Sequence, residues 1–217
     1  MEILTKTTIT ECPPILKLWN EGERHWIIMF SGGVESTYLL WKVLTESLHP
    51  VHAHFIRFVG TEYQRDNVNW IIDNMNYRDF EFKESNYGCT YPSSNIMLDV
   101  ATIGAYVCSG YSRENNVPIE NITFARGFNK EDATEPGHNI PISSTLFHNY
   151  FIPANGDVDR LPVIDHRVTG NVTKADMVSQ LPKILYDKTI SCVNYTDNGP
   201  CHTCTKCEER EYAEGIY

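Results

Sequence analysis

Two groups of residues in this chain have types and spacings that could do chemistry. The first is Ser31-Gly32-Gly33-Val34-Glu35-Ser36-Thr37, which directly follows the apolar run Trp26–Phe30. Adjacent glycines allow a tight turn and a close approach to a ligand, because neither carries a Cβ. A helical pattern begins after Val34, and the free N–H groups and partial positive charge of a helix N-terminus suit an anion. The pattern predicts a phosphate-binding loop, and the alternative is an ordinary strand–turn–helix corner.

The second group is a set of four cysteines, Cys192, Cys201, Cys204 and Cys207, in the pattern C-x8-C-x2-C-x2-C. Thiolates at a two-residue spacing can surround a tetrahedral ion, and four of them leave no open coordination position. The pattern predicts a structural zinc site that folds a tail too short for a core of its own. Two alternatives stay open: an iron–sulfur cluster, and a zinc site in which His202 replaces one cysteine.

A doubly wound α/β domain is the fold that would position the phosphate loop. Strands are predicted at 26–30, 51–58, 80–82 and 122–128. Helical patterns follow Val34, cover 68–75 and 93–115, and return at 173–186. Strands that alternate with helices imply a parallel sheet, in which ligands bind beyond the carboxyl ends of the strands. Both the Ser31 loop and the loop Asn129–Asp132 fall at that edge.

Three details complete this prediction. Pro182 should kink or divide the last helix, and Thr173 should cap it. His52 and His54 are best explained by alternation on a half-buried strand. Residues 133–171 are rich in Pro, Gly, Asn and His, and are predicted to be irregular.

The composition is that of a globular protein. The 217 residues are 41% hydrophobic and 21% charged, and their net charge is −10. The acidic balance argues against a general nucleic-acid or membrane surface. No apolar run approaches the ~20 residues of a membrane helix, and no signal-peptide core is present, so a cytoplasmic protein is expected. Seven cysteines in such a chain indicate metal binding or chemistry rather than disulfides.

The phosphate loop resembles that of the PP-loop ATP pyrophosphatases, whose motif is SGGxDS after the first strand. Here the motif runs from Ser31 to Ser36, with Glu35 where that family has aspartate. The family cleaves ATP between the α and β phosphates and transfers AMP to a substrate oxygen. The resemblance implies a Rossmann-like fold of the adenine nucleotide alpha-hydrolase type. It also implies that Ser31, Gly32, Gly33, Val34, Glu35, Ser36 and Thr37 bind ATP with Mg²⁺.

Together with the cysteines, the resemblance extends to the 7-cyano-7-deazaguanine synthases. That family ends in Ser-Cys, a gap, C-G-x-C-x-x-C and a basic residue, which is similar to Ser191-Cys192, Cys201–Cys207 and Arg210. His202 stands at the glycine position. The P-x-R-N motif of the family resembles Pro92–Asn95, with serine in place of arginine, and its G-x-N-x-x-D loop resembles Gly127–Asp132. Its helix entry ending in lysine looks like Pro162 through Lys174.

This resemblance implies an ATP-dependent ligase that adenylates 7-carboxy-7-deazaguanine and uses ammonia to give the amide and then the nitrile (preQ0). Glu35, Ser36 and Asp132 would be catalytic. The substrate-binding residues would be Asn95, Arg126, Asn129 and Lys130, although Arg126 and Lys130 also fit solvated loop charges. The implied parts are an N-terminal extension (1–24), an ATP-binding domain (25–190) and a zinc-binding tail with four cysteines (191–217). The resemblance also implies a homodimer.

Two other functions stay open at this point. One is a PP-loop sulfur transferase acting on RNA, but such enzymes need a catalytic cysteine pair or an RNA-binding appendage, and the chain is acidic. The other is a nucleotide-binding homologue without turnover, in which Glu35 and Ser94 mark the lost activity.

Overall fold

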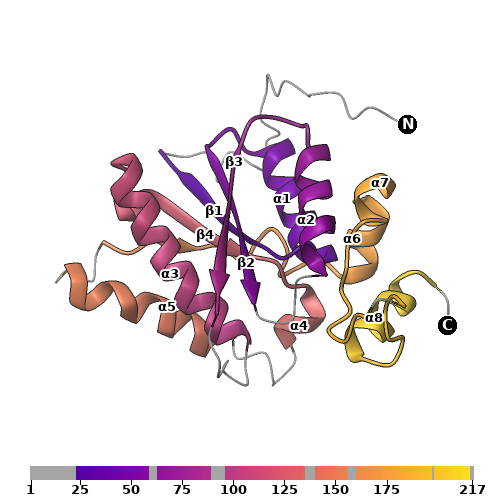
Figure 1. Ribbon diagram of the computed structural model, residues 1–217. Helices are drawn as coiled ribbons and strands as arrows, with labels where there is room; N and C mark the ends of the chain where they lie inside the picture. Colours follow the sequence, from indigo (N-terminus) through magenta and orange to yellow (C-terminus); the bar gives the residue numbers. More distant parts are fainter. Residues whose placement is uncertain are drawn as a thin grey trace.

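A five-stranded, parallel sheet organises the part of the chain that the structure describes (Figure 1). The computed structural model describes residues 23–58, 63–88, 96–134, 140–155, 160–196 and 198–215. The strands are β1 (His25–Phe30), β2 (Val51–Phe58), β3 (Glu81–Tyr87), β4 (Ile122–Arg126) and β5 (Val163–Ile164). Their order is β3-β2-β1-β4-β5, and each neighbouring pair is parallel. The predicted doubly wound α/β fold is confirmed.

Helices cover both faces of the sheet (Figure 1). One face carries α1 (Val34–Glu46), α2 (Gln64–Asn74), α6 (Lys174–Gln180) and α7 (Lys183–Tyr186). The other face carries α3 (Ile96–Asn115) and α5 (Ile140–Asn155). A 3₁₀ turn (Ile119–Asn121), α4 (Lys130–Thr134) and α8 (Thr205–Ala213) complete the described elements. None of the described helices is long and apolar enough to cross a membrane.

The central strand β1 is apolar on both faces. Trp26, Ile28 and Phe30 pack into the core under α1 and α2, whereas Ile27 and Met29 pack into the core under α3 and α5. Each of these side chains is at most 5% exposed. A strand covered by helices on both sides needs such a continuous apolar run, which explains why β1 could be recognised from the sequence.

The strand order reverses at β1. The chain passes from β1 through α1 to β2 on one side, and later crosses back through α3 to β4, which pairs with the other side of β1. The carboxyl ends of β1 and β4 therefore form the topological switch point, where ligands bind in open α/β sheets. Ser31 directly follows β1 and Gly127 directly follows β4, so both predicted loops meet there.

The last predicted helix is divided at Pro182, as expected. Thr173 caps α6, because its hydroxyl accepts a hydrogen bond from the N–H of Asp176. The chain then turns at Leu181, and α7 begins after Pro182. Proline lacks the N–H that a continuous helix would need at this position.

The prediction that 133–171 is irregular is wrong over Ile140–Asn155, which form α5. Pro141 lies in the first turn of this helix, where its missing N–H costs nothing. Phe147 and Phe151, four residues apart, are at most 2% exposed and pack against α3 and the sheet. Residues 135–139 and 156–159 lie outside the described part of the chain. The predicted N-terminal extension also lies outside it, except for Glu23 and Arg24.

Candidate nucleotide site and cysteine cluster

The Ser31–Ser36 turn is held by hydrogen bonds around the hydroxyl of Ser36. This hydroxyl accepts from the N–H of Ser31 at 3.2 Å, lies 3.1 Å from Oγ of Ser31 and donates to the carbonyl of Gly33 at 3.2 Å. Gly33 is the residue that precedes α1, and it has no side chain with which to cap the helix. The first N–H groups of α1 are therefore not covered by a capping side chain, which is the arrangement that suits an anion.

Glycine is required at two positions around this turn. Gly32 has a φ of +75°, and a Cβ there would lie 2.8 Å from Cγ2 of Val68. A Cβ on Gly127 would lie 2.4 Å from the backbone nitrogen of Ser36 and 2.6 Å from the carbonyl carbon of Glu35. The backbone after β4 thus lies directly on the first turn of α1, and no side chain at 127 could be accommodated without moving the backbone.

A cavity of about 250 Å³ lies at this switch point. Its polar wall includes Ser31, Glu35, Ser36, Arg126, Ser191 and Lys206. Apolar side chains from β1, β2 and α3 form much of the rest, among them Met29, Ile56, Phe58 and Val100. A pocket with a few convergent polar groups and an apolar remainder is the usual form of a small-molecule site.

A network of charges surrounds the polar wall. Nζ of Lys174 lies 2.8 Å from Oε1 of Glu35 and 2.5 Å from Oε2 of Glu209. Nζ of Lys206 lies 2.9 Å from both Oδ1 of Asp132 and Oε2 of Glu209. Burial alone would lower the pKa of Lys206, but the carboxylates of Asp132 and Glu209 outweigh it and raise that pKa. Lys206 therefore carries a positive charge into the cavity at any physiological pH.

Asn129 and Asp132 cap the short helix α4 reciprocally. Oδ1 of Asn129 accepts from the N–H of Asp132 at 2.7 Å, and Oδ2 of Asp132 accepts from the N–H of Asn129 at 3.1 Å. This is the geometry of a capping box. The remaining contacts lead toward the site, because Nδ2 of Asn129 donates to Glu35 at 3.3 Å and Oδ1 of Asp132 binds Lys206. Neither residue lines the cavity itself.

The other residues predicted for the site fall into three groups. Ser31, Gly33, Glu35, Ser36 and Arg126 line the cavity. Gly32, Val34 and Thr37 belong to the same turn but not to the cavity wall, and Val34 and Thr37 are fully buried. Lys130 is exposed on α4 and is not part of the cavity wall, and Asn95 lies outside the described residues.

Arg126 is not a solvated loop charge. It is 3% exposed, and its Nη2 donates to Oγ of Ser143 on α5 at 2.5 Å. Burial lowers the pKa of Arg126 to about 10, so the guanidinium still keeps its charge at neutral pH. A buried arginine in a cavity wall is a fixed cation for an anionic ligand.

Three charged residues of this site were not predicted as site residues, although the resemblance matched Lys174 to a motif lysine. Lys174, Glu209 and Lys206 come from α6 and α8, far along the chain from the Ser31 turn. The sequence offers one indication of the position of Lys206, which lies between Cys204 and Cys207. A metal ion bound by both cysteines would hold the residues between them in place.

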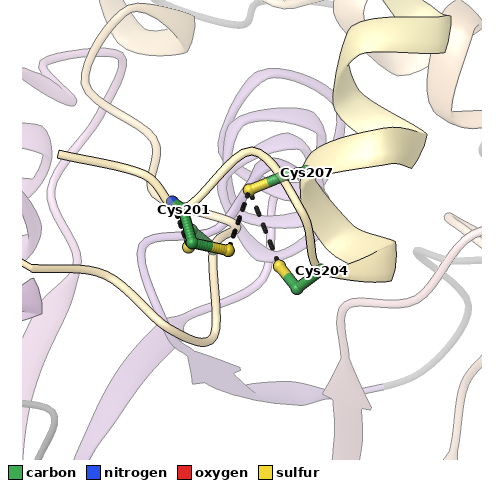
Figure 2. A group of neighbouring side chains, drawn as sticks. Cys201, Cys204 and Cys207 are labelled. Carbon is green, nitrogen blue, oxygen red and sulfur yellow. Dashed lines mark hydrogen bonds between the residues drawn. The ribbon is translucent and has the colours of Figure 1, made fainter.

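The four cysteines form one cluster. Figure 2 shows Cys201, Cys204 and Cys207 of this cluster. The four Sγ atoms all lie within 4.8 Å of one another, with Cys204–Cys207 at 3.6 Å and Cys201–Cys207 at 4.0 Å. Four thiolates ~2.3 Å from one tetrahedral zinc ion would be ~3.8 Å apart, so the residues fit a single ion. The N–H of Cys201 also donates to Sγ of Cys192 at 3.3 Å, as backbone groups do around bound thiolates.

His202 is turned away from this cluster. Its Nδ1 lies 2.7 Å from Oε1 of Glu211, and its side chain is 66% exposed. Its φ is 56°, in the left-handed region that favours glycine. This explains why glycine is the residue expected at that position from the resemblance, and it leaves the four cysteines as the residues that could hold a metal ion.

The cluster borders the cavity. Ser191 and Val193, on either side of Cys192, line the cavity, and so does Lys206. The carbonyl of Gly32 also accepts a hydrogen bond from the N–H of Ile190 at 3.0 Å. The segment that leads into the cysteines is therefore attached to the Ser31–Ser36 turn.

No protein-family model matches the chain, and no curated protein sequence matches it. Among solved structures, NMN synthetase from Francisella tularensis matches with a TM-score of 0.50 and 12% identity, over 92% of this chain and 79% of the synthetase. This chain has the fold of that synthetase. The U34-tRNA thiolase NcsA from Methanococcus maripaludis, solved with its [4Fe-4S] cluster, matches with a TM-score of 0.46 and 11% identity, over 90% of this chain and 66% of the thiolase.

Proposed function

We propose that this chain is an ATP-dependent ligase of the PP-loop type. It would transfer AMP from ATP to the carboxylate of 7-carboxy-7-deazaguanine and use ammonia to make the amide and then the nitrile. The observation that carries the proposal is the convergence of the Ser31–Ser36 turn, Arg126 and Lys206 on one cavity at the switch point. The sequence resemblance supplies the substrate.

The polar wall suits a polyphosphate. The hydroxyl of Ser31 and the first N–H groups of α1 would hold phosphate oxygens, and Arg126 and Lys206 would neutralise their charge. Mg²⁺ bound with ATP would add to this neutralisation. Glu35 is the carboxylate of the cavity wall that could hold this ion. Nζ of Lys174, 2.8 Å from Oε1 of Glu35, keeps the Glu35 side chain in place. Catalysis would then consist mainly of positioning and charge stabilisation.

The chemistry follows from the poor reactivity of a carboxylate. Attack on it would have to expel oxide, whereas an acyl adenylate expels AMP. Ammonia can therefore form the amide, and a second adenylation, on the amide oxygen, allows loss of that oxygen to give the nitrile. The apolar wall around Phe58 and Met29 suits the flat ring of such a substrate.

We also propose that the ion of the cysteine cluster is structural zinc. A single tetrahedral ion fits sulfurs 3.6 to 4.8 Å apart. A [4Fe–4S] cluster would hold its cysteines farther apart, because each thiolate binds a different iron atom. The ion would keep Lys206 and Ser191 in the cavity wall, so it would support nucleotide binding without taking part in the reaction.

Exchange of labelled pyrophosphate into ATP tests the proposal. The wild-type protein should catalyse exchange only when the deazapurine acid is present, and ammonia should convert the acid to amide and nitrile. Ser36→Ala removes the hydroxyl that organises the turn and should reduce exchange about 10²-fold. Ser179→Ala, on the exposed surface of α6, is the matched control and should leave it unchanged. Exchange that depends on a transfer RNA instead would favour the sulfur transferase.

A further inference from the structure

Five charged side chains from four helices form one alternating row beside the cavity. Glu35 comes from α1, Lys174 from α6, Asp132 from α4, and Lys206 and Glu209 from α8, which lies next to α4 and α6 (Figure 1). In the order Glu35, Lys174, Glu209, Lys206, Asp132, each neighbouring pair is a salt bridge of 2.5 to 2.9 Å. Glu35 and Lys206 line the cavity, and the other three do not. This charged row therefore connects the phosphate loop to the helix that follows the cysteines.

Glu209 is the central member of the row. Its Oε2 lies 2.5 Å from Nζ of Lys174 and 2.9 Å from Nζ of Lys206, so both ammonium groups share one oxygen. Two like charges within two hydrogen-bond lengths repel each other, and a carboxylate between them offsets that repulsion. The side chain of Glu209 is 22% exposed, so solvent screens its charge only in part. Glu209 therefore holds the two lysines together.

The same contacts occupy the hydrogen-bond donors of Lys206. An ammonium group has three N–H donors. Three carboxylate oxygens lie within 3.0 Å of Nζ of Lys206, one from Asp132 and two from Glu209. A phosphate oxygen must therefore replace one of these contacts. The contact to Oε1 of Glu209 is the one that can be released with the least disturbance, because Oε2 then still joins both lysines.

The charge balance of the row decides which form of a nucleotide it favours. Three carboxylates face two ammonium groups, so both lysines are neutralised before a ligand arrives. The polyphosphate of metal-free ATP is negatively charged and meets a row whose net charge is also negative. ATP with bound Mg²⁺ carries positive charge of its own, and Glu35 in the cavity wall is the carboxylate that can approach the ion.

We propose that Glu209 makes the site select Mg²⁺-bound ATP over metal-free ATP. The inference rests on the proposed function, which assigns the cavity to ATP. Glu209 acts as a positioning residue, through the two lysines. It shares Lys174 with Glu35, so that Glu35 keeps negative charge for the metal ion, and it holds Lys206 back from the phosphates of metal-free ATP. Without the charge of Glu209, Lys174 would pair with Glu35 alone and Lys206 would turn to the phosphates.

Calorimetric titration with ATP, in excess Mg²⁺ and in EDTA, measures this selectivity without turnover. Glu209→Gln removes the charge and keeps the size of the side chain. It should bind ATP in EDTA about 10-fold more tightly than wild type, the effect of one unit charge removed at short range in a partly exposed site. It should also need about 10-fold more Mg²⁺ for half-maximal pyrophosphate exchange, because Lys174 then competes with the ion for Glu35.

Two further variants separate the charge of Glu209 from a general defect. Glu209→Asp keeps the charge and should stay within about threefold of wild type in both measurements. Glu208→Gln is the matched control, because it makes the same change of net charge at the neighbouring, exposed residue of α8, which does not line the cavity. It should leave both ATP affinities and the Mg²⁺ requirement unchanged.

The outcomes distinguish the two proposals. If Glu209→Gln keeps the wild-type ratio of the two ATP affinities, or weakens both forms of ATP equally, Glu209 does not set the selectivity and the ligase stands. If Glu209→Asp matches Glu209→Gln, the charge is not the cause and the inference is likewise wrong. If wild-type protein shows this selectivity but no pyrophosphate exchange with the deazapurine acid, the proposed reaction falls and the role of Glu209 stands. If wild-type protein binds neither form of ATP, both proposals fall.

Discussion

Replacement of Gly127 by alanine should displace the Ser31–Ser36 turn, although every polar residue of the site is kept. The added Cβ would lie 2.4 Å from the backbone nitrogen of Ser36, whereas ordinary contacts of a Cβ begin at 3.4 Å. The backbone after β4 and the first turn of α1 must therefore separate by about 1.0 Å, the difference between these two distances. No side-chain rotation can relieve this contact, because both sides of it are backbone.

The size of the effect follows from that displacement. Overpacking of a tight interior costs ~1–3 kcal/mol in the free energy of unfolding. A shift of ~1 Å in the groups that position a substrate can reduce turnover ~10²-fold. We therefore expect Gly127→Ala to remain folded at room temperature, to unfold at lower urea concentration, and to lose pyrophosphate exchange about 10²-fold.

Gly110→Ala is the matched control. A Cβ on Gly110 would meet no atom within 4 Å, and the residue lies inside α3. Alanine should stabilise this helix by ~0.5–1 kcal/mol and leave exchange unchanged. Urea unfolding followed by circular dichroism, with exchange measured on the same samples, tests both variants. Wild-type stability and exchange in Gly127→Ala would refute the close approach of the two loops.

Three further predictions concern the charges and the cysteines. Lys206→Met should weaken ATP binding about 10- to 100-fold in calorimetry, since a hydrogen bond to a charged group contributes ~1.5–3 kcal/mol. Lys130→Met, at an exposed residue, should leave the affinity for ATP unchanged. Equal affinities of the two variants would show that Lys206 does not bind ATP. Elemental analysis should find about one zinc per chain and much less in Cys207→Ser, and a brown protein containing iron would contradict the zinc assignment. The pKa of His54, about 4, lies below the unfolded value of 6.5, so the unfolded chain binds more protons and stability is lost as the pH falls from 6.5 to 4. In urea titrations, the free energy of unfolding of His54→Gln should fall by ~3 kcal/mol less over this pH range than that of the wild type. Parallel curves of unfolding free energy against pH for the two proteins would contradict the burial of a neutral ring.

The sheet and its first loop were predictable because their signals are local. An apolar run such as Trp26–Phe30 suits only a strand covered on both faces, and two glycines before a helical pattern mark a tight turn. Thr173 likewise predicted the start of α6, and Pro182 predicted the division of the last helical pattern. Each of these inferences depends on a few neighbouring residues, and each agrees with the structure.

The parts that failed or were missed depend on contacts between distant segments. The helix α5 was not predicted, because Pro141 and several polar residues suggested a loop. Phe147 and Phe151 form its buried side, but this side is recognisable only from their packing against α3. The strand β3 extends beyond the predicted 80–82 to Tyr87, although its outer residues are polar, because it pairs with β2 along its length. The position of Lys206 in the cavity required knowing that the cysteine tail folds back onto the Ser31 turn.

The transfer of oxygen from the substrate to AMP tests the central claim most directly. The deazapurine acid labelled with ¹⁸O in its carboxylate is incubated with the protein, ATP, Mg²⁺ and ammonia, and the nucleotide product is analysed by mass spectrometry. Attack of the carboxylate on the α phosphate, followed by loss of AMP to ammonia, predicts AMP that carries one ¹⁸O. AMP without the label, or label found only in phosphate or pyrophosphate, would contradict adenylation of a carboxylate at this site.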